Sequence, residues 1–275
     1  MTVSDLKVPG TQGAPAVGIR MYRPASATGD VPVLVWMHGG GMILGNHLSE
    51  EESNMAFARD LGIAVVSVDY RLAPQSPAPA AVEDCYAVAE WLVANASELA
   101  INPQRIALGG ASAGGGLAAA TALLAHDRGG VTPAFQLLIY PMLDDRTVLR
   151  TDVDTTHARF WLPGSNRYAW SAYLGQAPGG ATVSEYAAPA RRIDLAGLPP
   201  AWIGVGTLDL FYSEDLDYAE GLRTAGVPVD LVVVEGAFHG FDVLFSKKPV
   251  SRRFWEAQRD SLGRALVDSR TGLNQ

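Results

Sequence analysis

Short apolar runs rich in valine and isoleucine recur along the chain, separated by longer stretches in which apolar and polar residues mix. Apolar runs of about four to eight residues that are bounded by turn-forming residues are typical of buried strands. The strands predicted on this basis are Val33–Met37, Ile63–Asp69, Arg105–Gly109, Phe135–Tyr140, Trp202–Gly206 and Val229–Glu235.

Most of the intervening stretches have the length and the amphipathic spacing of helices. The predicted helices are Ser49–Leu61, Ala78–Ala96, Ala113–Arg128, Tyr212–Ala225 and a closing helix, Ser251–Val267. Alternating strands and helices favour a mostly parallel central sheet with helices on both faces, so the fold class is α/β. We expect residues 1–275 to form a single domain, since 48% of them are hydrophobic and can bury one sizeable core.

Two segments do not follow this alternation. Met142–Thr182 is rich in aromatic residues and interrupted by proline and glycine, and we expect it to be a small cap inserted over the site. Residues 1–30 form a short N-terminal segment, so little N-terminal cap is expected. The aromatic residues of the insertion line an acyl pocket or form a small core, and core packing is favoured. They are Phe160, Trp161, Tyr168, Trp170 and Tyr173.

Acidic residues outnumber basic ones by 29 to 21, which gives a formal net charge of −8. A field of this sign opposes binding to nucleic acid and to anionic membranes, so small uncharged molecules are the expected partners. Cys85 is the only cysteine, which excludes an internal disulfide, and no apolar stretch has the length of a membrane span. These features favour a cytoplasmic protein.

Ser112 lies in the sequence Gly110-Ala111-Ser112-Ala113-Gly114, between a predicted strand and a helix of small residues. A sharp strand-to-helix turn exposes such a serine at a helix N-terminus, and the flanking glycines prevent clashes with neighbouring backbone. A glycine-rich helix start without chemistry is the alternative. The context favours a nucleophile.

The run His38-Gly39-Gly40-Gly41 follows another predicted strand, where its backbone N–H groups are free of side chains. An acyl-transfer intermediate needs such donors for its oxyanion. We therefore predict an oxyanion hole from Gly39, Gly40 and Ala113. A tight turn is the less favoured interpretation.

A serine nucleophile needs a histidine as base and a carboxylate that orients the histidine. His239 follows the predicted strand Val229–Glu235, and Asp209 follows the strand before it, so both are expected at the same sheet edge as Ser112. The order serine, aspartate, histidine is that of α/β-hydrolases. The following helix holds three weaker candidates for this acid: Glu214, Asp215 and Asp217. Asp242 is also disfavoured, because it is too near His239 in sequence to reach its ring easily.

With these blocks in place, the sequence resembles the bacterial hormone-sensitive-lipase-like esterases, family IV of the α/β-hydrolase superfamily, from about Val31 onward. Further matching blocks are Asp69-Tyr70-Arg71-Leu72-Ala73-Pro74, Pro79-Ala80-Ala81-Val82-Glu83-Asp84 and His239-Gly240-Phe241. The resemblance implies an α/β-hydrolase fold and hydrolysis of short-chain acyl esters without a cofactor. Asp69 and Arg71 are expected to be scaffold, because a charged pair beside a core strand usually fixes loop geometry.

The chain departs from the family pattern at three places. Ala111 stands where the family has Asp or Glu before the serine, and Gln75 replaces a glutamate. The segment before His38 is shorter than in the family, which again indicates little N-terminal cap. We assign Gly41, Trp161 and Phe241 to substrate contact, expect no metal or cofactor, and expect a homodimer if a second copy walls the open site.

Two other functions remain open at this point. An amidase or arylformamidase uses the same triad, since the acid step can also protonate a departing nitrogen. A ligand receptor on a hydrolase scaffold is disfavoured, because receptors of this kind lack the catalytic histidine and His239 is present here.

Overall fold

A computed structural model describes residues 1–152 and 155–267. Its centre is an eight-stranded sheet in the order β1-β2-β4-β3-β5-β6-β7-β8. The strands are β1 (Thr2–Val8), β2 (Val17–Arg23), β3 (Val31–Met37), β4 (Ala64–Asp69), β5 (Ile101–Ala111), β6 (Phe135–Ile139), β7 (Ala201–Gly206) and β8 (Val229–Val234).

Strands β3 to β8 pair in parallel, whereas β1 and β2 pair with each other, and β2 with β4, in antiparallel fashion. The predicted α/β class with a mostly parallel sheet is therefore confirmed. Residues 1–30, for which no element was predicted, supply the β1–β2 hairpin. This hairpin widens the sheet at one side, and between its strands it holds one short 3₁₀ turn and no α-helix.

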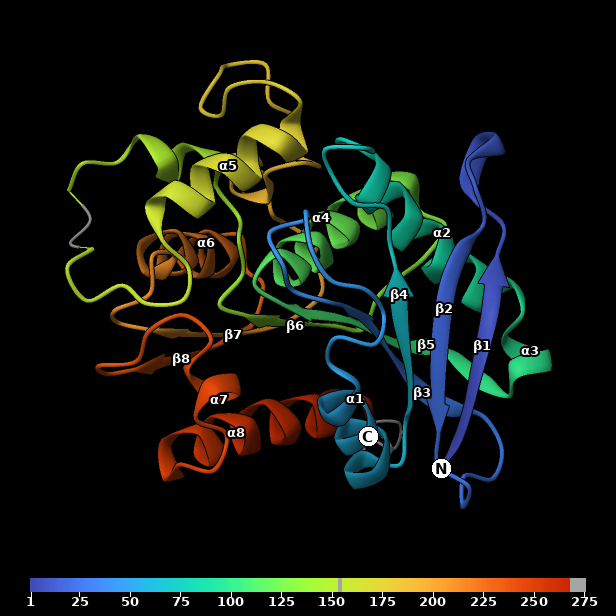
Figure 1. Ribbon diagram of the computed structural model, residues 1–275. Helices are drawn as coiled ribbons and strands as arrows, with labels where there is room; N and C mark the ends of the chain where they lie inside the picture. Colours follow the sequence, from blue (N-terminus) through green and yellow to red (C-terminus); the bar gives the residue numbers. More distant parts are fainter. Residues whose placement is uncertain (153–154, 268–275) are drawn as a thin grey trace.

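Helices cover both faces of the sheet. Figure 1 shows α2, α4 and α6 on one face, and α1 and α8 on the other. The α-helices are α1 (Glu51–Leu61), α2 (Ala80–Ala94), α3 (Ala96–Leu99), α4 (Ala113–Arg128), α5 (Pro163–Leu174), α6 (Tyr212–Thr224), α7 (Phe241–Leu244) and α8 (Pro249–Leu266). Short 3₁₀ turns are η1 (Thr11–Gly13), η2 (Asp145–Leu149) and η3 (Pro189–Arg191).

Strand β3 shows how the sequence builds two cores. Because successive side chains of a strand point to opposite faces, Val33 and Val35 pack under α2 and α4, whereas Leu34 and Trp36 pack towards α1 and α8. All seven residues of this strand are buried. A continuous apolar run is the pattern expected for a central strand with helices on both faces.

The loop after β4 is fixed by an ion pair, although the partners differ from those expected. Arg71 pairs with Asp84, at 2.7 Å between Nη2 and Oδ1, and its backbone N–H donates to the same carboxylate. Asp69 faces His47 instead, 3.2 Å from its Nδ1. Asp84 is buried and sits on α2, so the pair ties this helix to the end of β4.

Residues Met142–Thr182, expected from the sequence to be a cap insertion and called the cap segment below, contain η2 and α5; residues 153–154 lie outside the described residues. Trp170 and Tyr173 of α5 are fully buried, with ring centroids 6.2 Å apart, as core packing predicts. Phe160 and Tyr168 are exposed instead. The aromatic residues of this segment therefore divide between packing and surface positions.

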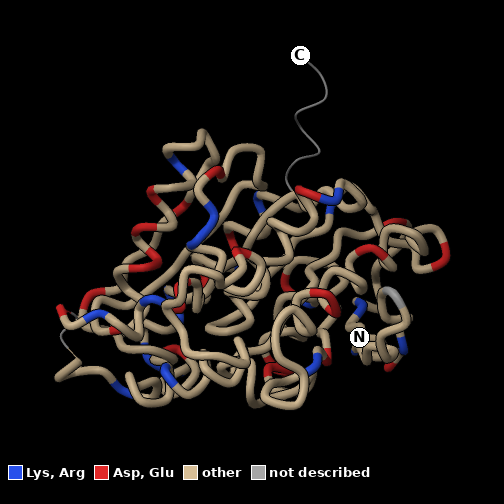
Figure 2. The backbone as a smooth tube through the Cα atoms, turned by 90° about the horizontal axis from the view of Figure 1, so that it is seen from above, with Lys and Arg blue, Asp and Glu red and all other residues tan. Residues whose placement is uncertain are grey.

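Charged residues of both signs lie next to one another around the molecule (Figure 2). Within residues 1–152 and 155–267, no helix has the length and apolar character needed to cross a bilayer.

Candidate active site

Ser112 occupies the turn between β5 and α4 with a backbone φ of 57° and ψ of −121°. An L-residue rarely adopts a positive φ, and a strained serine at a strand-to-helix turn is the geometry of a nucleophile elbow. Three backbone hydrogen bonds hold it: the Ser112 N–H donates to Ile139 O at 2.8 Å, and its carbonyl accepts from Met142 N at 2.9 Å and from Gly116 N at 3.1 Å. The predicted elbow is present.

The glycines on either side of Ser112 are required by close backbone contacts. A β-carbon on Gly110 would collide with the backbone of Gly114 and with Met37 O, and one on Gly114 would collide with Met37 O and His38 O. The end of β3 therefore passes directly against the elbow. This contact brings the glycine loop, residues 38–45, beside the nucleophile.

The side chains of Ser112, His239 and Asp209 form one continuous chain of contacts. His239 Nε2 lies 2.9 Å from Ser112 Oγ, and His239 Nδ1 lies 2.8 Å from Asp209 Oδ2. All three residues are buried, with Ser112 retaining 7% exposure. A Ser–His–Asp arrangement in the predicted order is therefore present, and its geometry permits proton transfer from the hydroxyl to the imidazole.

The loops after β7 and β8 hold the acid and the base in position. Asp209 Oδ1 accepts the Phe211 N–H at 2.9 Å, which leaves Oδ2 for the histidine. The imidazole of His239 contacts two rings edge-on, with centroids 4.7 Å from Tyr140 and 5.2 Å from Phe211. These contacts restrict rotation of the imidazole.

The three amides predicted for the oxyanion hole differ in their partners. Within the described part of the chain, the N–H groups of Gly40 and Ala113 have no protein acceptor. The Gly39 N–H donates to Glu50 Oε1 at 3.1 Å. Two of the three amides are therefore free to bind an oxyanion, and the third is engaged.

Trp161 of the cap segment lies on the glycine loop. A β-carbon on Gly41 would be 2.5 Å from Trp161 Cη2, and the indole centroid is 6.4 Å from that of His239. These two residues, assigned to substrate contact from sequence, therefore lie together beside the triad. Phe241, assigned likewise, is buried against Phe254 with centroids 5.0 Å apart, which is a core position and lends no support to a substrate contact.

The acids considered as alternatives to Asp209 lie elsewhere. Glu214 accepts from the backbone N–H groups of Leu143 and Asp144, and also from the Thr147 hydroxyl. Asp215 is fully buried, and its carboxylate oxygens have no hydrogen-bond partner among the described residues. Burial raises the pKa of Glu214 to about 8 and that of Asp215 well above its ordinary value.

Two residues near the triad were not singled out by the sequence: Glu50 and Tyr140. Tyr140 donates its hydroxyl to Asp242 Oδ1 at 2.9 Å. Burial raises the pKa of Tyr140 and of Asp242, and it raises that of Glu50 to about 7. Glu50 stands in a run of three glutamates whose members look alike in sequence, so no signal marked the one that accepts hydrogen bonds from Trp36 and Gly39.

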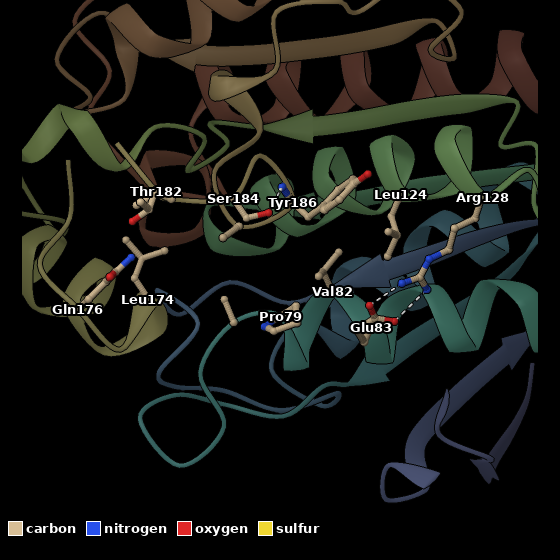
Figure 3. A pocket seen from close by; sticks show the side chains of 13 residues that line it. Pro79, Val82, Glu83, Leu124, Arg128, Leu174, Gln176, Thr182, Ser184 and Tyr186 are labelled. Atoms are coloured by element: carbon tan, nitrogen blue, oxygen red, sulfur yellow. Dashed lines mark hydrogen bonds and ion pairs between the residues drawn. The ribbon is translucent and has the colours of Figure 1, made fainter. Parts of the chain in front are cut away.

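A cavity of about 400 Å³ lies away from the triad (Figure 3). Its lining includes Leu124 and Arg128 at the C-terminal end of α4, and Arg128 there pairs with Glu83 at 2.6 Å. Leu124 is twelve residues along the helix from Ser112, which corresponds to about 18 Å at 1.5 Å per residue. The cavity is therefore separate from the reacting groups.

No group of three or more histidine, cysteine, aspartate or glutamate side chains in residues 1–152 and 155–267 has the geometry of a metal site. At the triad, Ser112 Oγ contacts His239 Nε2, and free backbone amides of the glycine loop and of Ala113 lie nearby. The fold and this arrangement define a serine hydrolase of the α/β-hydrolase class.

Comparison with known proteins supports the assignment to this class. The profile of a family described as alpha/beta hydrolase fold matches residues 34–243. The carboxylic ester hydrolase LipN of Mycobacterium tuberculosis (strain H37Rv) is 39% identical over 261 residues, which span 88% of this chain and 65% of LipN. The carboxylesterase NlhH of the same organism is 37% identical over 238 residues, spanning 84% of this chain and 73% of NlhH.

Among solved structures, a bacterial heroin esterase superposes with a TM-score of 0.92 at 43% identity, over 96% of this chain and 84% of that one. The chain therefore belongs to the hormone-sensitive-lipase-like carboxylic ester hydrolases of the α/β-hydrolase superfamily.

Proposed function

We propose that the protein hydrolyses short-chain carboxylic esters, with Ser112 as nucleophile, His239 as general base and acid, and Asp209 orienting the histidine. The observation that carries this proposal is the unbroken contact from Ser112 Oγ to His239 at 2.9 Å and on to Asp209 at 2.8 Å. A serine hydroxyl needs such a base to become nucleophilic.

In the acylation step, Ser112 Oγ attacks the ester carbonyl carbon while its proton moves to His239 Nε2. The carbonyl oxygen becomes an oxyanion that accepts hydrogen bonds from the N–H groups of Gly40 and Ala113. The helix α4 points its N-terminus at the same place, and its dipole favours negative charge there. When the intermediate collapses, the bond to the alcohol oxygen breaks and the proton passes from Nε2 to the departing alkoxide.

Deacylation repeats the sequence with water as the nucleophile. His239 Nε2 takes a proton from the water as its oxygen attacks the acyl carbon, and the same amides receive the second oxyanion. The proton then returns to Ser112 Oγ as the acid leaves. Throughout, Asp209 Oδ2 accepts a hydrogen bond from the Nδ1–H of His239 and keeps the imidazole in the tautomer that presents a free Nε2.

We assign the role of a small cap to the segment Met142–Thr182 on the evidence of Trp161. Its indole covers Gly41 and approaches His239, so it occupies space where a long acyl chain would otherwise lie. The low exposure of Ser112 supports the same idea. A confined space beside the acyl carbon favours small acyl groups over long ones.

Exposed apolar side chains next to the site support the expected homodimer. Leu44 lies in the glycine loop, Phe160 lies against Gly240, and Leu162 is adjacent to Trp161; all three are at least 48% exposed. A second copy that covers this rim would bury apolar area. Sedimentation velocity and the hydrolysis rate per site, both measured over a dilution series, test the dimer. A monomer at all concentrations, with a constant rate per site, contradicts it.

The proposed chemistry is tested with Ser112→Ala. We expect loss of p-nitrophenyl acetate hydrolysis approaching a millionfold, as for nucleophile removal in a comparable triad, with the fold unchanged by circular dichroism. A fluorophosphonate probe, which reacts only with an activated serine, should label the wild type and not the variant. Retention of activity within about tenfold of wild type would refute the assignment, and labelling without turnover would favour a binding protein.

A further inference from the structure

Glu50 immediately precedes α1, and its carboxylate accepts hydrogen bonds from two donors at the end of β3. The Gly39 N–H donates to Oε1 at 3.1 Å, and the Trp36 indole N–H donates to Oε2 at 2.5 Å. Trp36 is itself buried in the core between the sheet and α1. The carboxylate is therefore attached to a rigid side chain on one side and to the start of the glycine loop on the other.

This carboxylate lies close to the nucleophile. A β-carbon placed on Gly39 would be 3.3 Å from Glu50 Oε1 and 3.7 Å from Ser112 Cβ. Gly39 thus separates the two side chains. Of the three predicted donors, Gly39 has its N–H engaged by Glu50, whereas the N–H groups of Gly40 and Ala113 have no protein acceptor in the described part of the chain.

We propose that Glu50 is a positioning residue for ester hydrolysis: it holds the Gly39 peptide so that the neighbouring Gly40 N–H is aimed, with that of Ala113, at the oxyanion. This inference rests on the proposed function. Gly39, Gly40 and Gly41 have no side chains to restrict their backbone, and Gly40 adopts a φ of 117° that only glycine tolerates easily. The loop therefore needs an external anchor to be preorganised, and preorganised donors are what stabilise an oxyanion.

The surroundings of Glu50 make this anchor sensitive to pH. Asp242 of α7 acts on it electrostatically, Tyr140 at the end of β6 donates to Asp242, and Tyr140 also contacts His239. Burial raises the pKa of Glu50 to about 7. The ionised carboxylate accepts hydrogen bonds from both the Gly39 N–H and the Trp36 indole N–H. The protonated acid instead presents a hydroxyl group, itself a donor, to one of these two N–H groups. Activity should therefore fall as Glu50 takes up a proton.

Glu50→Gln tests the role, because an amide of the same size has only one acceptor oxygen for the two donors and no charge to titrate. Glu52→Gln is the matched control: Glu52 is exposed two residues further on, with no hydrogen bond to Gly39. Rates are expressed per active site titrated with the fluorophosphonate, so that misfolded protein does not count.

For Glu50→Gln we expect kcat to fall by about 10- to 100-fold, less than the 10²–10³-fold loss of a whole oxyanion donor, with KM changed by less than about threefold. Affinity for a trifluoromethyl ketone, which forms an oxyanion adduct on the serine, should fall by the same factor. The Glu50 contribution to the acid side of the kcat/KM profile should disappear. Glu52→Gln should match wild type.

Equal rates per titrated site for Glu50→Gln and Glu52→Gln would overturn the proposal while leaving the Ser112 chemistry intact. If Glu50→Gln does not fold, Trp36→Phe replaces it. Loss of the indole donor removes a hydrogen bond to the ionised carboxylate and so raises its pKa. The acid limb of the profile should then move to higher pH, and an unmoved limb would equally overturn the role of Glu50.

Discussion

Trp161 and Gly41 are in direct contact, and only glycine permits it. A β-carbon on Gly41 would be 2.5 Å from Trp161 Cη2 and 3.1 Å from Cζ2, and the backbone there has a φ of 62°. The indole therefore fixes the position of the cap segment relative to the glycine loop. This contact places the cap segment next to a proposed oxyanion donor, because Gly41 follows Gly40 directly.

Gly41→Ala should lower kcat/KM by about 10- to 100-fold, because the new methyl collides with the indole and the positive φ costs roughly 1–3 kcal/mol. Trp161→Ala should relieve the collision. The fall in kcat/KM of the double variant should therefore be smaller than the product of the falls in the two single variants. The four proteins are compared with one short ester. If Gly41→Ala lowers kcat/KM by the same factor in wild type and in Trp161→Ala, the contact does not limit the reaction in the way proposed.

Gly175→Ala is the matched control for this cycle. Gly175 also has a positive φ, of 65°, but the nearest atom to its β-carbon would be Pro77 Cβ at 3.7 Å. It ends α5, away from the triad. We expect this substitution to lower stability modestly without changing kcat/KM.

Asp209→Asn should reduce kcat on the order of 10⁴-fold while the protein stays folded, because an amide at this position favours the wrong histidine tautomer. Asp215→Asn should leave kcat within about threefold of wild type, since Asp215 has no contact with the imidazole. Steady-state kinetics on both variants decides the matter. An exchange of the two outcomes would show that the orienting acid is misassigned.

The chemistry of this site was predictable because each part has its own local signal. Ser112 lies between a strand and a small-residue helix, the glycine run follows another strand, and parallel strands bring their carboxyl ends to one sheet edge. Asp209 and His239 follow from the same rule. All six predicted strands exist, with β5 beginning at Ile101 and so earlier than the predicted Arg105.

The parts that escaped prediction depend on partners distant in sequence. Strand β1 alternates exposed and half-buried residues, and its position becomes clear only when it pairs with β2 at the side of the sheet. The partner of Arg71 proved to be Asp84 on α2 and not Asp69. Glu50 likewise acquires its role from Trp36 and Gly39, whose approach to it no local pattern encodes.

Asp215 should make stability pH-dependent. Its raised pKa means that the folded protein keeps a proton that the unfolded chain releases above about pH 4, so the free energy of unfolding falls as pH rises. The slope for one group is at most about 1.4 kcal/mol per pH unit. Asp215→Asn removes this pH dependence. In urea unfolding at pH 5, 6.5 and 8, the free energy of unfolding of the variant should therefore rise relative to that of wild type as pH rises.

Glu50 and Glu214, whose pKa values burial raises to about 7 and about 8, contribute slopes of the same sign to both proteins. These slopes cancel in the difference between wild type and Asp215→Asn. A difference that stays constant from pH 5 to pH 8 would show that Asp215 is not protonated in the folded state.

The contact of Trp161 with the glycine loop also predicts the acyl-chain profile. Each methylene that enters an apolar pocket contributes about 0.8 kcal/mol, so a deep pocket would reward every added carbon several-fold. Because the indole occupies space beside His239, kcat/KM over a series of p-nitrophenyl esters should peak at roughly two to six carbons and fall beyond about ten. Trp161→Ala should move the peak to longer chains, since it opens the space the indole fills. Tyr168→Ala is the control, because Tyr168 is exposed on the outside of α5 and its loss should leave the peak in place. A wild-type preference for long-chain esters, or a peak that Trp161→Ala does not move, would contradict the role given to this side chain.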